Sequence, residues 1–377
     1  MKLAIVRQKY TPFGGAERFV ERALSALEQQ GMAVTLISRR WNAGERRQGL
    51  VCNPFYLGRL WRDAGFAACV RRVIRERAFD LVQSHERIPG CNVFRAGDGV
   101  HAAWLARRAV FDGRWSRWAR AFSPWHRYIL RAEARMFRHP GLKAVICISR
   151  MVRDDIVRHY GTDPAKLHVI YNGLDLDEFH PDLAARHRDE VRRQQGADAA
   201  TPVFVYVGSG YARKGVATLI AAAAGMRETA AQFWIIGKDK NLDRYRRLAE
   251  KTGVAARFRF LGGQREVRPF LAAADAFVLP TIYEPLSNAV LEALACGLPA
   301  LVTRSCGAAE LVTPGESGYV FDAGDATALA AYLDRTAAPG AAAAMRAAAR
   351  EAVARLSAEA MAGELVALYD RLLNDGP

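Results

Sequence analysis

The sequence predicts an α/β protein of two doubly wound, Rossmann-like domains, each built on a parallel sheet. The first observation is a βαβ unit at the start, where an apolar strand, LAIV, leads through the loop TPFGG to an amphipathic helix at about 16–30 and a second strand, AVTLIS. The second is that the alternation of strands and helices restarts near residue 201. The third is the length of 377 residues, ample for two domains of roughly 100 to 200 residues. Two such domains face a central cleft between the carboxyl ends of their sheets, where ligands bind.

The first domain is expected to span residues 1–172. Short apolar runs follow helical or loop segments at FDLVQSH near residue 82, CNVFRAG near residue 93 and KAVICIS near residue 146. Each run predicts a strand, and together they predict an open parallel sheet with helices on its faces.

The second domain is expected to span residues 201–357, beyond a linker at 173–200 that becomes charged and polar at RHRDEVRRQQGADAATP. Its strands are predicted at VFVYVGSG, FWIIG, FRFLG, AFVLPT and PALVT. Alanine-rich helices end the chain from about residue 326. We expect the last helix, at about 358–377, to pack back on the first domain.

Composition limits the partners and the compartment. The net charge of +15 demands an anionic partner or substrate, such as nucleic acid, acidic lipid or a phosphorylated sugar. No run approaches the roughly 18 apolar residues of a spanning helix, and the start, MKLAIVRQKY, is charged too early for a signal peptide, so we expect a cytoplasmic protein. The six cysteines lack metal-site or disulfide spacing, which predicts reduced thiols and no metal.

The stretch TIYEPLSNAVLEALACGLPA combines an anion site with two carboxylates. Pro285 suits the first position of a helix, and free amides near Ser287 and Asn288 would then suit a phosphate. Glu284 would lie at the helix mouth and Glu292 two turns later, roughly 12 Å along the axis. That distance matches a nucleoside diphosphate sugar held by one carboxylate at the hexose and one at the ribose. A solvated helix with ordinary acidic residues is the competing interpretation.

Two turns between a strand and a helix could contact the same ligand. In GSGYARKGVATL, Arg213 and Lys214 could neutralise a diphosphate and stabilise it as a leaving group. An exposed basic turn is the alternative, but the place at the carboxyl end of a strand favours the ligand site. Gly14 and Gly15 would allow close approach of a phosphate, although they form no GxGxxG motif and a plain turn explains them equally well.

The segment HERIPGCNVFRAGDGVHAAW carries the clustered titratable groups of the first domain, namely His85, Glu86, Asp98 and His101. Strand ends are predicted around them, so they could face the hydroxyl group of an acceptor. For either histidine alone, a structural role is the commoner one.

The basic segment at residues 104–138 holds nine arginines and four tryptophans against only two carboxylates. Arginine with interfacial tryptophan is what a segment on an anionic membrane surface requires. The residues expected at that surface are Arg114, Trp115, Arg117, Trp118, Arg120 and Trp125. A face that binds only a phosphorylated acceptor, or a solvated surface, is the alternative. Single-stranded nucleic acid could use the same composition, but Glu284 and Glu292 would repel a phosphate backbone, so no nucleic-acid partner is expected.

Taken together, these motifs resemble the retaining family 4 glycosyltransferases of GT-B fold. The resemblance rests on GSGYARKG, on an E-x7-E element followed by EALACGLPALVT, and on SGYVFD, and it spans most of the chain from TPFGGAER onwards. Within that family, YTPFGGAER, SHERIPGCNVFRAGD and YNGLDLDEFHP look most like the lipopolysaccharide core glucosyltransferases that act on inner-core heptose.

The resemblance implies a donor site. Its residues would be Gly14, Gly15, Arg213, Lys214, Gln264, Arg265, Glu284, Ser287, Asn288 and Glu292. The first glutamate would bind hydroxyls of the donor sugar and the second those of the ribose, while the serine and asparagine would meet the distal phosphate. Arg213 and Lys214 would hold the diphosphate as it leaves, the two glycines would cover it, and Gln264 and Arg265 would lie beside the base.

The resemblance also implies how catalysis proceeds. Asp98, Lys214 and Glu284 would be the catalytic residues, with Asp98 near the acceptor and His101 in contact with acceptor or sugar. The departing phosphate would take the acceptor's proton, so no enzymic base, cofactor or metal is expected. The apparent DxD motif at 175–177 falls in the connection between the domains.

We therefore expect a retaining hexosyltransferase that moves glucose from UDP-glucose to the lipopolysaccharide inner core or a similar lipid-linked glycan. It would bind peripherally to the inner face of the cytoplasmic membrane. Pro285-Leu286 departs from the small residues that the family usually has there. The alternatives are a nucleotide-sugar epimerase or hydrolase of the same fold, and a non-catalytic anion or nucleic-acid binder.

Overall fold

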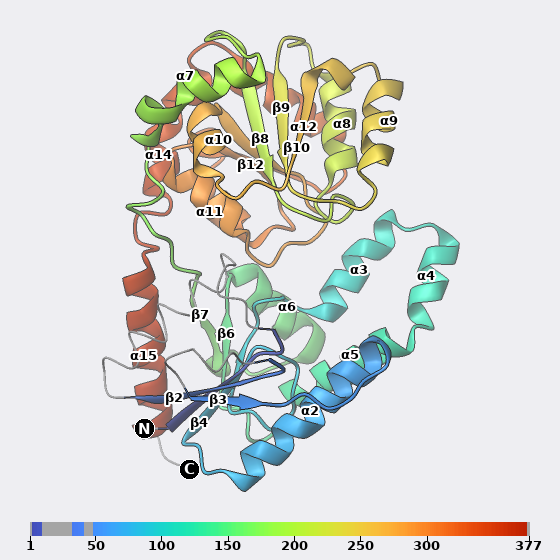
Figure 1. Cartoon of the computed structure of the whole chain (residues 1–377), viewed down its shortest axis with the longest axis vertical. Coiled ribbons are helices and arrows are strands. Elements are labelled where there is room, and N and C mark those ends of the chain that lie inside the picture. Colours follow the sequence, from blue (N-terminus) through green and yellow to red (C-terminus); the bar gives the residue numbers. More distant parts are fainter. Residues whose placement is uncertain (1, 10–31, 41–47, 375–377) are drawn as a thin grey trace. The chain divides into compact units, whose positions relative to one another are not determined.

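The computed structural model describes residues 2–9, 32–40 and 48–374 of the chain. The chain forms two compact units, one of Met1–Gly173 with Ala358–Pro377 and the other of Leu174–Ser357 (Figure 1). Each unit holds one parallel sheet between helices, so the predicted α/β class with two Rossmann-like domains is confirmed.

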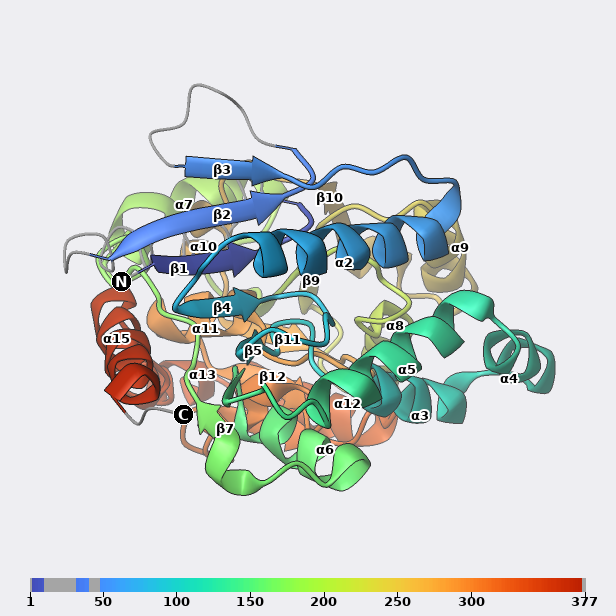
Figure 2. The same ribbon diagram turned by 90° about the horizontal axis from the view of Figure 1, so that it is seen from below.

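The sheet of the first unit has the strand order β3-β2-β1-β4-β5-β6-β7, and every pairing in it is parallel (Figure 2). Its strands are β1 (Lys2–Val6), β2 (Ala33–Ser38), β3 (Gln48–Val51), β4 (Leu81–Ser84), β5 (Val93–Arg95), β6 (Ala144–Cys147) and β7 (Leu167–Val169). Its helices are α2 (Gly58–Glu76), α3 (His101–Phe111), α4 (Arg114–Ala121), α5 (Pro124–Phe137), α6 (Arg150–Tyr160) and α15 (Ala358–Asn374), with a 3-10 turn at Pro164–Lys166. The predicted helix at about 16–30 lies outside the described residues.

Strand β1 is buried on both faces because helices cover both sides of the sheet. Leu3 and Ile5 pack in one cluster with Met361, Leu365 and other residues of α15. Alternate residues of β1 face the other way and pack against α2. Side chains alternate between the faces of a strand, so a continuous apolar run such as LAIV suits a sheet enclosed in this way. The last helix belongs to the first unit through this packing.

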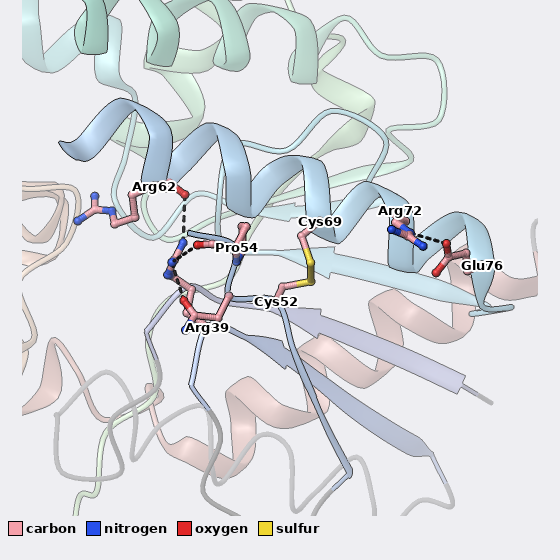
Figure 3. Close-up of a disulfide and its surroundings, with 8 residues drawn as sticks. Arg39, Cys52, Pro54, Arg62, Cys69, Arg72 and Glu76 are labelled. Atoms are coloured by element: carbon pink, nitrogen blue, oxygen red, sulfur yellow. Dashed lines mark hydrogen bonds and ion pairs between the residues drawn. A yellow bond between two sulfur atoms is a disulfide. The ribbon is translucent and has the colours of Figure 1, made fainter. Parts of the chain in front are cut away.

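A disulfide joins Cys52, which follows β3, to Cys69 in α2 (Figure 3). The prediction that all six cysteines are reduced thiols is therefore wrong for this pair. The two cysteines are 17 residues apart in the chain, and neither belongs to a motif, so only the fold brings them together. The remaining four cysteines are free and buried.

The sheet of the second unit has the order β10-β9-β8-β11-β12-β13, and its pairings are also parallel. Its strands are β8 (Val203–Val207), β9 (Gln232–Ile236), β10 (Phe258–Gly262), β11 (Ala276–Leu279), β12 (Ala300–Thr303) and β13 (Gly318–Phe321). Its helices are α7 (Leu183–Gln195), α8 (Val216–Gly225), α9 (Leu242–Lys251), α10 (Arg268–Ala273), α11 (Asn288–Ala295), α12 (Ala326–Ala337), α13 (Ala341–Ala344) and α14 (Arg346–Glu351), with 3-10 turns at Ala255–Arg257 and Gly307–Leu311.

The polar segment 173–200 is largely part of the second unit, because α7 packs there against α10. Arg188 Nη2 lies 2.6 Å from Asp275 Oδ1, and the almost fully buried Arg192 donates to the Ala273 carbonyl at 2.9 Å. These partners satisfy the half-buried Arg188 and the buried Arg192, which explains how so polar a segment can fold onto an apolar sheet.

The strand order of the second sheet reverses between β8 and β11. The chain runs outward from β8 through β9 to β10, then returns to the other side of β8 with β11. In open α/β sheets, the loops that leave such a reversal point at the carboxyl ends of the strands form the ligand crevice. The loops after β8 and β11 carry GSGYARKG and TIYEPLSN.

Candidate functional site

Two loops of the second unit are fastened together through the backbone of Arg213. Its carbonyl accepts hydrogen bonds from the Ile282 amide at 2.9 Å and from Thr281 Oγ1 at 3.1 Å. Gly215 ends the first loop with φ of +76°, and a side chain there would collide with the Pro280 carbonyl. Only glycine fits that close approach, so the two loops are held as one surface.

Three charged side chains converge on this surface. Glu284 Oε2 lies 2.7 Å from Arg213 Nη1 and 3.0 Å from Lys214 Nζ. The Glu284 and Lys214 side chains are almost buried, at 13% and 12% exposure, and that of Arg213 is 35% exposed. Two cations against one carboxylate leave the cluster a formal charge of +1, and hydrogen bonds among charged groups in such a setting are strong. Three residues predicted from the sequence as site residues therefore lie together in the structure.

The backbone on either side of the carboxylate is fixed as well. The Glu284 amide donates to the Ser305 carbonyl at 3.0 Å, and the Glu284 carbonyl accepts from the Gly307 amide at 2.8 Å. The loop after β11 is therefore tied to the loop after β12. Glu284 has a defined position before any ligand binds, which favours the precise placement of a sugar or phosphate.

Gly208 gives the Lys214 side chain its path. A methyl group added at Gly208 would lie 2.5 Å from Lys214 Cδ and 3.0 Å from Cε. The aliphatic part of the lysine therefore crosses the glycine before its ammonium group reaches Glu284. The first glycine of GSGYARKG is needed because the Lys214 side chain passes close to its backbone. The sequence pattern alone did not reveal this reason.

Helix α11 begins later than the sequence predicted. Its first residue is Asn288 and its N-cap is Ser287, whose Oγ accepts from the Val290 amide at 3.4 Å. The placement of Pro285 at the first helical position is therefore wrong, because Glu284 pairs in a short bridge with Cys306 and the chain stays extended. The predicted distance of roughly 12 Å between Glu284 and Glu292 assumed an unbroken helix from one to the other, so it does not apply to the structure.

Gln264 and Arg265 lie exposed in the loop after the edge strand β10. Gln264 Nε2 donates to the Leu261 carbonyl at 2.6 Å. Next to them lies Lys238 from the loop after β9, because a methyl group at Gly263 would lie 2.7 Å from Lys238 Cε. Lys238 is an exposed cation beside the expected base-binding loop, and it was not predicted from the sequence. The signal was present, since GKDK follows the strand FWII as directly as GSG follows VFVYV.

A second set of site candidates belongs to the first unit. Asp98 is exposed in the loop between β5 and α3, and His101 is the first residue of α3. The His101 amide donates to Glu133 Oε1 at 2.9 Å, and Arg87 Nε donates to the same carboxylate at 2.7 Å. The fully buried Glu133 thus caps α3 with its charge neutralised by arginine.

His101 is nearly enclosed, with 9% of the residue exposed. Its Nε2 lies 3.0 Å from Nδ1 of His126, and it stacks on Trp104. Burial, and then the nearby Arg87, lower the pKa of His101 to about 4, so the ring is neutral near neutral pH. One histidine donates to the other in this pair, which gives His101 a clear structural role.

The basic segment forms the helices α3, α4 and α5. Figures 1 and 2 both show α4 at the tip of this group, away from the sheet of the first unit. Trp115 and Trp118 are exposed, at 84% and 61%. Trp125 instead donates its indole N–H to Asp63 Oδ2 at 2.7 Å, and Arg120 pairs with Asp112. The expected membrane surface therefore divides into exposed and internally bonded residues. The side chains of Arg114 and Arg117 lie outside the described part, as do Gly14 and Gly15 entirely.

The described residues contain no cluster of three or more His, Cys, Asp or Glu side chains arranged to hold a metal ion. At the apparent DxD, Asp175 Oδ1 accepts from the amides of Asp177 at 3.2 Å and Glu178 at 2.9 Å, which makes it part of a local turn. Across the same described ranges, no helix combines the length and apolar character needed to span a bilayer.

Family comparisons agree with this architecture. The model described as Glycosyltransferase Family 4 matches residues 13–178, and that described as Glycosyl transferases group 1 matches residues 187–352. Lipopolysaccharide core biosynthesis glycosyltransferase LpsD of Rhizobium meliloti (strain 1021) is 33% identical over 343 residues, which cover 85% of this chain and 84% of LpsD. Lipopolysaccharide glucosyltransferase WaaG of Escherichia coli (strain K12) is 28% identical over 328 residues, 85% of each chain.

Solved structures share the fold. A crystal structure of WaaG, a glycosyltransferase involved in lipopolysaccharide biosynthesis, has a TM-score of 0.81 at 24% identity and covers 96% of this chain and 98% of its own. Anabaena Alr3699/HepE, solved in complex with UDP and glucose, has a TM-score of 0.73 at 20% identity and covers 98% of this chain and 99% of its own.

Proposed function

Because the chain belongs to the family 4 glycosyltransferases of GT-B fold, we propose that it transfers glucose from UDP-glucose to a lipopolysaccharide inner-core or similar lipid-linked glycan, with retention of configuration. The observation that carries the proposal is the convergence of Arg213 and Lys214 on Glu284 at the strand-order reversal of the second sheet. A nucleoside diphosphate sugar needs cations for its phosphates and an acceptor of hydrogen bonds for its sugar hydroxyls, and this cluster offers both.

In the proposed reaction, the bond between the anomeric carbon and the diphosphate oxygen breaks while the acceptor oxygen attacks from the same face. The acceptor's proton passes to the departing phosphate oxygen, so the products are the glycoside and UDP. Arg213 and Lys214 stabilise the charge that grows on the diphosphate, and Glu284 orients the sugar. The ribose is proposed to contact Glu292, the distal phosphate to contact Ser287 and Asn288, and the base to contact Gln264 and Arg265. Asp98 is proposed to lie near the acceptor.

The donor and acceptor are inferred from relatives. HepE is described in complex with UDP and glucose, which supports UDP-glucose as the donor. WaaG and LpsD carry names that refer to lipopolysaccharide, which supports a lipid-linked glycan as the acceptor. We propose a reaction without a metal or other cofactor, in which Arg213 and Lys214 supply the positive charge that the departing diphosphate needs.

We also propose that the protein works at the cytoplasmic face of the membrane. Trp115 and Trp118 are exposed on the arginine-rich helix α4, and Phe122 follows them at 59% exposure. Aromatic side chains enter the headgroup region while arginines bind lipid phosphates. An acceptor embedded in the inner leaflet would then lie close to the enzyme.

A nucleotide-sugar screen tests the donor site. UDP and UDP-glucose should raise the melting temperature, and the best ligand should support sugar transfer to truncated core lipopolysaccharide. Lys214→Ala should lower transfer by about a hundredfold. Lys251→Ala, an exposed lysine of α9 in the same unit, is the matched control and should be neutral. Equal activity in both variants, or release of free sugar at full rate without acceptor, would overturn the proposal.

A further inference from the structure

The loop that joins β3 to α2, together with the first turn of α2, exposes a second group of large apolar side chains, which we call the β3–α2 apolar surface. It consists of Phe55, Tyr56, Leu57 and Trp61, with exposures of 86%, 44%, 75% and 56%. Single exposed apolar residues are common, but four within seven positions form a patch of the kind that marks an interaction site.

A disulfide, hydrogen bonds from Arg39 and a cation–π contact hold this loop in place. The apolar side chains are therefore exposed on a fixed segment. The Cys52–Cys69 disulfide anchors its start to α2. Arg39, only 6% exposed, donates to Asn53 Oδ1 at 2.6 Å, to the Pro54 carbonyl at 3.1 Å and to the Arg62 carbonyl at 3.3 Å (Figure 3). The Arg39 guanidinium also lies 4.3 Å from the centre of the Tyr56 ring.

The charges around the surface are basic. The segment from Cys52 to Arg62 contains no carboxylate, and Arg59 is exposed in its middle. The nearest acid along the chain, Asp63, already accepts from Arg62 Nε at 2.8 Å, Gln8 Nε2 at 3.0 Å and Trp125 Nε1 at 2.7 Å. An incoming partner therefore meets aromatic and apolar side chains beside the cation Arg59. No carboxylate within the segment from Cys52 to Arg62 neutralises that cation.

The surface is connected with the exposed tryptophans of α4. The Asp63–Trp125 hydrogen bond joins the first turns of α2 to the start of α5, and α4 directly precedes α5. Arg59 lies 5.7 Å from the Trp125 ring on the same junction. The β3–α2 apolar surface and the exposed tryptophans of α4 therefore belong to neighbouring segments that this hydrogen bond links within the first unit.

We propose that the β3–α2 apolar surface is a second membrane-binding element, which inserts Phe55, Leu57 and Trp61 among anionic lipid headgroups. The inference rests on the proposed membrane location and adds a contact that α4 does not supply. A bilayer fits better than a second copy of the chain, because the segment from Cys52 to Arg62 carries arginines and no carboxylate, so two copies of it facing each other would supply these cations with no partner from the segment. Two contacts, unlike one, would fix the orientation of the first unit on the membrane.

Fluorescent labels at single introduced cysteines test the proposal in the full-length protein. Phe55→Cys reports on the loop, Trp118→Cys on α4, and Val157→Cys on α6, where the native valine is 38% exposed, as the control. The native cysteines are buried or disulfide-bonded, so an environment-sensitive dye will react at the introduced site. The probe membrane is phosphatidylcholine with about one third phosphatidylglycerol, with nitroxide-labelled lipid as quencher.

We expect a blue shift and quenching for the labels at 55 and 118, and neither for the label at 157. A response at 118 without one at 55 overturns the second element and leaves the proposed function intact. A response at 55 alone supports the loop and refutes membrane binding by α4. A shift at 55 that depends on protein concentration and needs no vesicles indicates a second copy and overturns the proposal.

A binding measurement completes the test. The double variant Phe55→Ser/Leu57→Ser should lower vesicle binding by at least about tenfold, since it removes two large apolar side chains from the contact. Val157→Ser should stay within about twofold of the wild type, by the same area argument. Both variants should melt at the temperature of the wild type. Unchanged binding by the correctly folded double variant contradicts the inference.

Discussion

Glu284 and Arg213 lie in a direct ion pair of 2.7 Å on loops that follow different strands of the second sheet. The Arg213 Nη1 that donates to the carboxylate also donates to the Tyr283 carbonyl at 3.0 Å, so the guanidinium is held from two directions. A guanidinium group that is already held in position needs little reorganisation when negative charge develops on a leaving group.

Glu284→Gln should separate binding from catalysis. The substitution keeps the shape but removes the negative charge, so Arg213 and Lys214 become freer to bind a diphosphate. UDP affinity, measured by calorimetry, should stay equal or rise, while kcat for transfer falls by about a hundredfold. Glu316→Gln, an exposed acid of the same unit, is the control. A parallel loss of UDP affinity and kcat would argue against this role for the carboxylate.

Gly208→Ala should impair activity through Lys214. The added methyl group would lie 2.5 Å from Lys214 Cδ, so the flexible lysine must move away from Glu284. We expect transfer to fall by at least about tenfold with little change in melting temperature. Gly363→Ala provides the comparison, because a methyl group there meets nothing within 4 Å. Wild-type kinetics for Gly208→Ala would mean that the lysine path is unimportant.

The disulfide should stabilise the first unit. Closing a loop of 17 residues in the unfolded chain is worth about 3 kcal/mol in the chain-entropy model. Reduction by dithiothreitol should therefore lower the melting temperature by several degrees, as followed by circular dichroism. The double variant Cys52→Ala/Cys69→Ala should melt low in either condition. A wild type that melts identically with and without reductant would refute a disulfide in solution.

His101 should make stability depend on pH. Its pKa of about 4 in the folded state lies below the ordinary value of 6.5, so the unfolded state binds more protons between these values. The stabilising contribution that the neutral His101 ring makes to the free energy of unfolding is complete above about pH 6.5. This contribution is lost as the pH falls towards 4. The free energy of unfolding of His101→Gln, measured in urea at several pH values, should fall less steeply with acid than that of the wild type. Equal slopes would show that His101 does not titrate in this way.

Much of the fold could be predicted because most inner strands are strongly apolar. LAIV, AVTLIS, VFVYV, FWII and AFVL are all strands in the structure. The strands missed were β3 (QGLV), β7 (LHV) and β13 (GYVF), each at the edge of its sheet. An edge strand has one neighbour and a less enclosed environment, so its sequence needs less apolar character. The fourth edge strand, β10, was predicted from its more apolar FRFLG.

The site could be predicted where short motifs fix it and not where distant residues meet. Arg213, Lys214 and Glu284 were found because each follows a strand whose end is recognisable. The start of α11 was misplaced because proline is equally suited to an extended segment, and the pairing of Glu284 with Cys306 decided between the two. Cys52–Cys69 and Asp63–Trp125 could not be read from spacing, because tertiary packing creates both contacts.

The proposed reaction is best tested by transfer of labelled glucose from UDP-glucose to truncated core lipopolysaccharide, with wild type and Lys214→Ala compared and the new linkage assigned by NMR. We expect α-linked glucose on the acceptor, release of one UDP for each glucose, and a rate about a hundredfold lower in the variant at unchanged melting temperature. Equal rates in the two proteins, or a β-linked product, would contradict the proposed reaction.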